Sequence, residues 1–227
     1  MKSWFFTGLA LLCGFSLSAQ EIITAKGYLD SVAERYGIIR DYEANITIRS
    51  GNSEMRGRAS YLTPSFLRID FTSPANQVIV FNGELLTIYL PEYRAVLNQE
   101  ISPSRRPASA GASMASAQGL MLLRRNYVPA FVTGPDPVPL DNSASDRVVK
   151  IRLTRQNISE GFREIILNID PNTKLIRRIE GRTIAEGLVQ FDFAGIKINQ
   201  GIPEQRFIYD SPASANLYNN FLFRDTN

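Results

Sequence analysis

Carboxylates are the residues in this sequence whose types and spacing suit acid–base chemistry. Histidine is absent, which removes the commonest general base and the commonest nitrogen ligand for zinc or copper. The carboxylates that fall close together form the pairs Asp41/Glu43, Asp70/Glu84 and Glu180/Glu186. Two neighbouring carboxylates can serve as general acid and general base in a hydrolase. The alternative interpretation is that each pair is ordinary surface charge.

Motifs for metal, phosphate or nucleophilic chemistry do not occur in the sequence. Asp136, Asp141 and Asp146 are spaced too loosely, among prolines, to form a calcium loop. There is no glycine-rich phosphate loop, no Gly-x-Ser-x-Gly elbow and no basic-aromatic surface for stacking bases. We therefore expect no cofactor, no metal ion and no nucleic-acid partner.

The first 19 residues have the composition of a secretory signal peptide. Lys2 precedes an apolar run, and small residues follow that run. The run is shorter than the roughly 20 apolar residues that span a membrane. Cys13, the one cysteine, follows Leu12, whereas a lipid-bearing cysteine needs a small residue before it. We expect residues 20–227 to form one cysteine-free domain that is stable without disulfides.

Short apolar segments that alternate with polar residues predict antiparallel strands. In the segment Phe66–Phe71, Leu67 and Ile69 share one face with Phe71, whereas the charged residues between them share the other. The residues predicted to face inward are Leu67, Ile69, Phe71, Val78, Val80, Leu86, Ile88, Val149, Ile151 and Phe191. Taken alone, this pattern also fits an ordinary hydrophobic core.

The number of such segments indicates the fold class. Asn82-Gly83 predicts a hairpin turn, and further strands follow residue 146 and end with Phe207–Tyr209. About ten or eleven strands with one apolar face favour a mainly β protein with a single strongly curved antiparallel sheet, or incomplete barrel.

Two helices are predicted beside the strands. Residues 23–36 place apolar side chains at three- and four-residue steps, with Thr24 as the N-cap and Gly37 as the stop. The segment 101–146 is irregular and rich in proline, alanine and serine. Within it, residues 115–125 predict a short helix whose apolar residues need an apolar surface beneath them.

The stretch 61–93 has a characteristic order of elements. In sequence these are Pro64, the strand Phe66–Phe71, Pro74, the apolar segment 77–81 with its Asn82-Gly83 turn, and the segment Leu86–Tyr93. This order resembles the LolA family of periplasmic lipoprotein carriers. The resemblance implies an incomplete barrel whose concave face and helical lid enclose an apolar cavity for lipoprotein acyl chains.

The resemblance also implies roles for particular residues. The inward-facing set would line the cavity wall, and the residues of the lid would be Met114, Leu120, Met121 and Leu123. The alternative is that the lid segment is a fixed helix that fills an ordinary core.

The chain departs from the family pattern at Thr63, where many members have a basic residue that holds the lid closed. Arg68, Arg124 and Arg125 are candidates to replace that contact or to bind a partner, although each also fits a solvated face. Tryptophan is common in the family where this chain has Ile69, which predicts a cavity of altered shape.

The function implied by the resemblance is that of a periplasmic, monomeric carrier that performs no bond chemistry. It would accept acylated lipoproteins from an inner-membrane ABC-type lipoprotein-releasing transporter and deliver them to an outer-membrane acceptor. The alternatives are a lipid- or lipoprotein-sensing regulatory domain of the same fold, a carrier of another lipid, and a carboxylate-dependent hydrolase. The tail from Tyr218 to Asn227 is either an extra strand or a docking segment.

Overall fold

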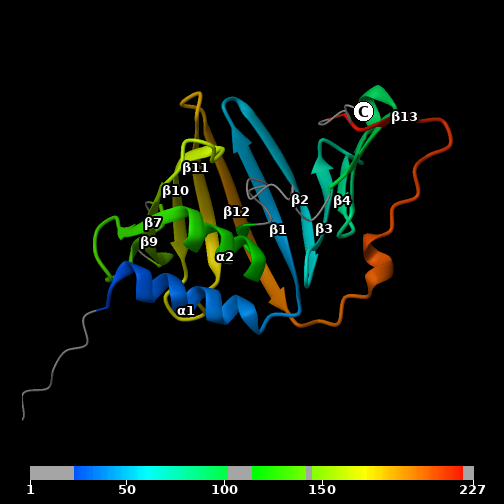
Figure 1. The fold of residues 1–227 in the computed structure, drawn as a ribbon. Helices are drawn as coiled ribbons and strands as arrows, with labels where there is room; N and C mark the ends of the chain where they lie inside the picture. The colour runs from blue at the N-terminus through cyan, green and yellow to red at the C-terminus, as the bar shows by residue number, and fades with distance from the viewer. Residues whose placement is uncertain (1–22, 102–113, 142–144, 222–227) are drawn as a thin grey trace, which may run out of the picture.

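Strands dominate the computed structural model, which describes residues 23–101, 114–141 and 145–221. They form one strongly curved sheet, with the helices α1 (Ala25–Gly37) and α2 (Ala117–Asn126) on its concave side (Figure 1). The predicted signal peptide lies outside the described residues. No helix within the described ranges is long and apolar enough to cross a membrane.

The strands follow one another as a meander with one long return. They are β1 (Asp41–Ser50), β2 (Ser53–Leu62), β3 (Phe66–Ser73), β4 (Val78–Phe81), β5 (Leu85–Leu90), β6 (Ala95–Glu100), β7 (Tyr127–Phe131), β8 (Val138–Pro139), β9 (Arg147–Arg155), β10 (Phe162–Ile169), β11 (Ile176–Thr183), β12 (Leu188–Ile198) and β13 (Asn216–Asn219). Their order across the sheet is β13-β6-β5-β4-β3-β2-β1-β12-β11-β10-β9-β7, with β8 paired to β9 off this path. The sheet is open between β13 and β7, so the predicted fold class is confirmed.

The structure adds strands in two places where the sequence pattern is weak. β7 and β8 lie in the segment predicted to be irregular, and β13 overlaps the start of the tail and pairs in parallel with β6. β7 is an edge strand, where Pro129 is tolerated because one side of the strand needs no ladder partner. The predicted strand at Phe207–Tyr209 is wrong, because Glu204–Phe207 forms a short 3-10 helix, η4.

Both helices begin at a hydroxyl cap. The Thr24 side chain accepts a hydrogen bond from the Gly27 N–H, and the Ser116 side chain accepts one from the Gly119 N–H, each at 3.0 Å. α1 ends at Gly37, as the sequence predicts. These caps fix where each helix starts against the sheet.

The register of the strands assigns each residue to one of the two faces, since directly paired residues point to the same side. Ile69 of β3 pairs with Ala59 of β2 and with Ile79 of β4. Ile69 packs in the core that includes α1 and α2, so all three residues face the concave side. Arg68 and the other alternating residues of β3 face the convex side.

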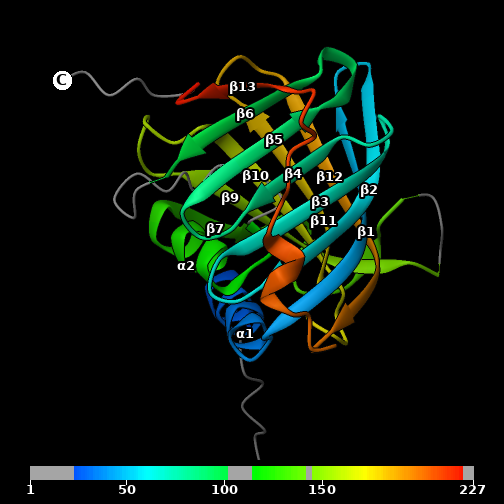
Figure 2. The same ribbon diagram turned by 90° about the vertical axis from the view of Figure 1, so that its right-hand side faces the viewer.

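The main core lies between the concave face and the two helices. It joins residues of α1, of α2 and of strands from both halves of the sheet. A smaller cluster lies on the convex side, where η4 and the chain after it cross β3 and β4 (Figure 2). The concave side is therefore the face that the helices cover.

Candidate functional site

The concave face carries a continuous apolar wall. Leu67, Ile69 and Phe71 of β3 are at most 8% exposed and belong to the main core. On the other half of the sheet, Ile151 and Phe191 belong to the same core. The register links the two halves through pairs such as Phe191 with Ile48, and Val149 continues the same face. The structure thus brings these predicted wall residues together.

Val78 and Val80 do not belong to that wall, so their predicted position is wrong. They pair with Asp70 and Arg68, which face the convex side. There they pack against Phe207, beneath the C-terminal segment. The concave positions of β4 are held by Ile79 and Phe81 instead, which pack on the main core.

Leu86 and Ile88 lie on the concave side at the less covered end of the sheet. They pair with Phe81 and Ile79, and both are half-buried. The apolar wall therefore continues beyond the buried core toward β5 and β6.

α2 covers the concave face with one side only. Leu120 and Leu123 are at most 1% exposed and, with Met114 just before the helix, pack in the main core. Met121 is 57% exposed, because its position is turned about 100° from that of Leu120 around the helix axis. Three of the four residues predicted for the lid therefore face the core, whereas Met121 lies on the solvent-exposed side of α2.

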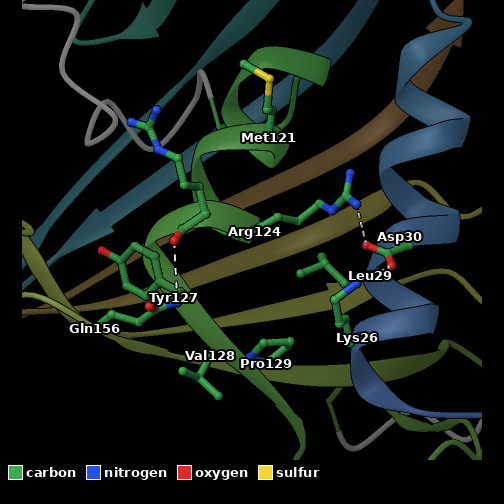
Figure 3. Close-up of a pocket in the computed structure, with 10 residues that line it drawn as sticks. Lys26, Leu29, Asp30, Met121, Arg124, Tyr127, Val128, Pro129 and Gln156 are labelled. Atoms are coloured by element: carbon green, nitrogen blue, oxygen red, sulfur yellow. Dashed lines mark hydrogen bonds and ion pairs between the residues drawn. The ribbon is translucent and has the colours of Figure 1, made fainter.

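A groove of about 510 Å³ lies between α1, α2 and β7 (Figure 3). Its apolar lining comes from Leu29, Val128, Pro129 and Met121, and its polar lining comes from Lys26, Asp30, Arg124, Arg125, Tyr127 and Gln156. Leu29 and Tyr127 also belong to the main core, so the groove reaches the edge of the covered interior.

One ion pair joins the two helices across this groove. Arg124 of α2 lies 2.7 Å from the Asp30 carboxylate of α1, and Lys26 lies 3.0 Å from the same carboxylate (Figure 3). The hydrogen bond from Lys26, followed by the charge of Arg124, holds the pKa of Asp30 below its ordinary value of 3.8. Arg124 is thus the predicted arginine that contacts α1, whereas Arg125 bonds its neighbour Asn126.

A group of tyrosines lies where the start of α2 meets the sheet. Tyr61 of β2 stacks on Tyr42 of β1, with ring centroids 5.2 Å apart. The Tyr61 hydroxyl donates to the Pro64 carbonyl at 3.1 Å, and the nearby Thr63 and Ser116 side chains partly offset the rise in its pKa that burial causes. Tyr61 therefore lies between Thr63 and Ser116, the N-cap of α2.

Arg68 lies on the convex side of the sheet, opposite to the face that α1 and α2 cover. Its guanidinium pairs with Asp70 at 2.9 Å and donates to the carbonyl oxygens of Arg206 and Ile208, on the convex side. Its position over the Tyr209 ring, 5.8 Å from the centroid, adds a cation–π contact. The hypothesis that Arg68 replaces the lid contact is wrong, because Arg68 holds the C-terminal segment instead.

Five of the six candidate carboxylates, all except Glu84, have a hydrogen-bond or ion-pair partner in the described part of the chain. Asp41 is 3% exposed and accepts hydrogen bonds from the backbone N–H groups of Gln200 and Gly201. Glu180 accepts one from Asn168, and Glu186 pairs with Arg163. Asp41, Glu180 and Glu186 thus bond neighbouring groups of the sheet and its loops.

Sequence reasoning missed Tyr42, Tyr61, Ile79 and Phe81. Tyr42 stands two residues before Ala44 and continues the inward alternation of β1, which is a signal that the sequence contains. Ile79 and Phe81 carry no such signal, because β4 is apolar at every position.

Comparison with known proteins supports the fold. No protein-family model and no curated protein sequence matches the chain. An uncharacterised conserved protein from Thermus thermophilus superposes with a TM-score of 0.54 at 13% identity, over 84% of this chain and 98% of that one. MucB superposes with a TM-score of 0.50 at 14% identity, over 82% of this chain and 63% of MucB.

A LolA superfamily protein, NE2245 from Nitrosomonas europaea, is also similar, with a TM-score of 0.43 at 14% identity over 82% of this chain and 98% of that one. The open, curved sheet with helices on its concave side agrees with the fold class expected from the sequence. At these identities the comparisons concern the fold alone.

Proposed function

We propose that this protein is a periplasmic carrier that binds the acyl chains of lipoproteins against its concave face. The observation that carries the proposal is the apolar wall, which runs from the core under α1 and α2 to the half-buried Leu86 and Ile88. Acyl chains need such a surface, since they have no groups for directional bonds. In this proposal residues 1–19 direct export and are then removed.

Binding requires movement of α2. Leu120, Leu123 and Met114 occupy the concave face in this structure, so they must leave before acyl chains can replace them. Each methylene that an acyl chain buries contributes roughly 0.8 kcal/mol, and each side chain that leaves the core loses roughly 1.5–3 kcal/mol, so about ten methylenes offset the loss of these contacts. The ion pair that joins α2 to α1, Asp30–Arg124, is partly exposed and therefore weak, which favours reversible opening of α2.

The direction of lipoprotein transfer in this proposal is set by the partners of the carrier. A carrier passes its cargo only to a site that binds it better or that is coupled to ATP hydrolysis elsewhere. The proposed partners are an inner-membrane ABC-type lipoprotein-releasing transporter and an outer-membrane acceptor. The protein itself is proposed to form or break no bond.

The first test is mass spectrometry of the protein purified from its native periplasm, before and after a detergent wash. The expected result is a co-purifying acylated lipoprotein that detergent releases. The second test is binding of a synthetic acylated lipopeptide by Ile88→Gln, with Ile184→Gln as the matched control. Ile88 is on the concave wall, whereas Ile184 is 50% exposed on the turn between β11 and β12.

The lipopeptide should bind Ile184→Gln like the wild type and Ile88→Gln more weakly. Equal binding by both variants would mean that the concave wall does not hold the cargo. Lipopeptide binding without transfer to acceptor liposomes, together with a stable complex with a periplasmic protein, would instead favour the sensor alternative.

A further inference from the structure

Tyr42 places a hydroxyl in the core that has no hydrogen-bond partner in the described part of the chain. The residue is 3% exposed, at the start of β1, and its ring stacks on Tyr61 with the planes 25° apart. Buried polar groups are nearly always paired, because an unpaired one lowers the stability of the folded state. The unpaired state of the Tyr42 hydroxyl is therefore unusual and needs a physical explanation.

The hydroxyls of the two neighbouring tyrosines differ from that of Tyr42, because both are engaged. The Tyr36 oxygen accepts a hydrogen bond from the Ile176 N–H at 3.1 Å, and the Tyr61 hydroxyl donates to the Pro64 carbonyl at 3.1 Å. Burial, followed by the electrostatic effect of Tyr36 and Tyr61, holds the pKa of Tyr42 well above its ordinary value of 10.0. Tyr42 thus keeps its proton and remains a free donor.

The position of Tyr42 indicates what kind of acceptor fits. It belongs to the same apolar cluster as Ile46 and Ile69, where a charged group would lose its hydration. It also stacks on Tyr61, whose hydroxyl lies near Ser116 at the start of the covering helix α2. A neutral acceptor attached to a hydrocarbon chain satisfies both conditions.

We propose that the Tyr42 hydroxyl donates a hydrogen bond to the ester carbonyl of a bound acyl chain, so that the interior prefers acyl esters to alkyl ethers of equal length. This inference rests on the proposed carrier function. It adds selection by chemical linkage, which an apolar wall alone does not provide. An ester carbonyl accepts a hydrogen bond far better than an ether oxygen, and it occurs both in acylated lipopeptides and in diacyl glycerophospholipids.

The test measures the affinities of the wild type and Tyr42→Phe for four probes. These are a diacylated lipopeptide, a diacyl glycerophospholipid, and the ether-linked analogue of each with the same chain lengths. The wild type should bind the ester about three- to tenfold more tightly than the ether, the range expected for one neutral hydrogen bond. Tyr42→Phe should bind the ester and the ether equally. The pair of probes for which the wild type shows the preference, lipopeptide or glycerophospholipid, identifies the source of the ester.

The melting temperature supplies an independent readout. Tyr42→Phe keeps the stacked ring and removes an unpaired hydroxyl, so its melting temperature should equal or exceed that of the wild type. The control Tyr36→Phe removes the acceptor of the Ile176 N–H, so it should melt lower and keep the ester preference.

Three results would overturn the inference. They are equal binding of ester and ether by the wild type, an ester preference that survives in Tyr42→Phe, and a lower melting temperature of Tyr42→Phe without a change in preference. A wild type that binds none of the four probes would instead reject the carrier function on which the inference depends.

Discussion

Asp30 of α1 and Arg124 of α2 form the ion pair that joins the two helices across the groove, with 2.7 Å between carboxylate and guanidinium. Arg124 is also one of the three arginines that were predicted from the sequence as candidates to hold a lid. The pair is partly exposed, with side chains 28% and 41% accessible, so water and salt weaken it. It is therefore suited to bias an opening motion rather than to prevent it.

Arg124→Ala should loosen α2 with little loss of global stability. We expect the free energy of unfolding to fall by less than about 1 kcal/mol, as for other exposed pairs. Amide hydrogen exchange in α2 should become faster, because the contact with Asp30 is lost. Arg125→Ala is the matched control and should leave exchange unchanged; equal effects of the two variants would exclude a specific role for the pair.

The same ion pair should respond to acid. Since the pKa of Asp30 is lowered in the folded state, mainly by the Lys26 hydrogen bond, the stabilisation is complete at neutral pH and disappears as the pH falls through a value below 3.8. Hydrogen exchange or helix-specific probes of the wild type should therefore show loosening of α2 in that range. Asp30→Asn should show no such acid-dependent step in α2.

Leu123→Ala and Met121→Ala should lower the free energy of unfolding by very different amounts, although both residues lie on α2. Leu123 is 1% exposed in the main core, so its truncation should lower the free energy of unfolding by about 2–5 kcal/mol. Met121 is 57% exposed, so its truncation should change that energy by less than about 0.5 kcal/mol. Chemical denaturation measures both. Similar losses would mean that α2 packs on the sheet through a different side.

Gly57→Ala should destabilise the sheet at the register shift between β2 and β3. A Cβ at Gly57 would lie 2.4 Å from the Asp70 carbonyl oxygen, which is backbone and cannot turn away. We expect a loss of about 1–3 kcal/mol, as for other overpacked sites. At Gly37, by contrast, a Cβ meets nothing within 4 Å, so Gly37→Ala should be neutral or stabilising. Thermal unfolding of the two variants compares them directly.

Arg68→Ala should release the C-terminal segment from the convex face. The change removes two hydrogen bonds to the carbonyls of Arg206 and Ile208 and the ion pair to Asp70. Charge-assisted bonds of this kind contribute about 1.5–3 kcal/mol each when well formed, so limited proteolysis near residue 208 should accelerate. Arg58→Ala, an exposed arginine of β2 on the same face, is the control. Resistance of Arg68→Ala to proteolysis would show that the remaining contacts, which include Phe207 and the Arg206–Asp70 ion pair, are sufficient to hold the segment.

Local patterns in the sequence were sufficient for several elements. The alternation of Leu67, Ile69 and Phe71 with charged residues assigned β3 its two faces, because only one face can be dry. The cap at Thr24 marked the start of α1, and the turn at Asp170, whose carboxylate accepts the backbone N–H of Thr173, marked the hairpin between β10 and β11.

The sequence by itself determined the curved antiparallel sheet and most of its apolar wall, because both depend on residues close together in the chain. The tertiary structure decided what depends on partners far away. β4 is apolar at every position, so only its register with β3 placed Val78 and Val80 on the convex side. Arg68 binds residues about 140 positions later, and β13 pairs with β6 across a similar separation, and no local pattern encodes such contacts.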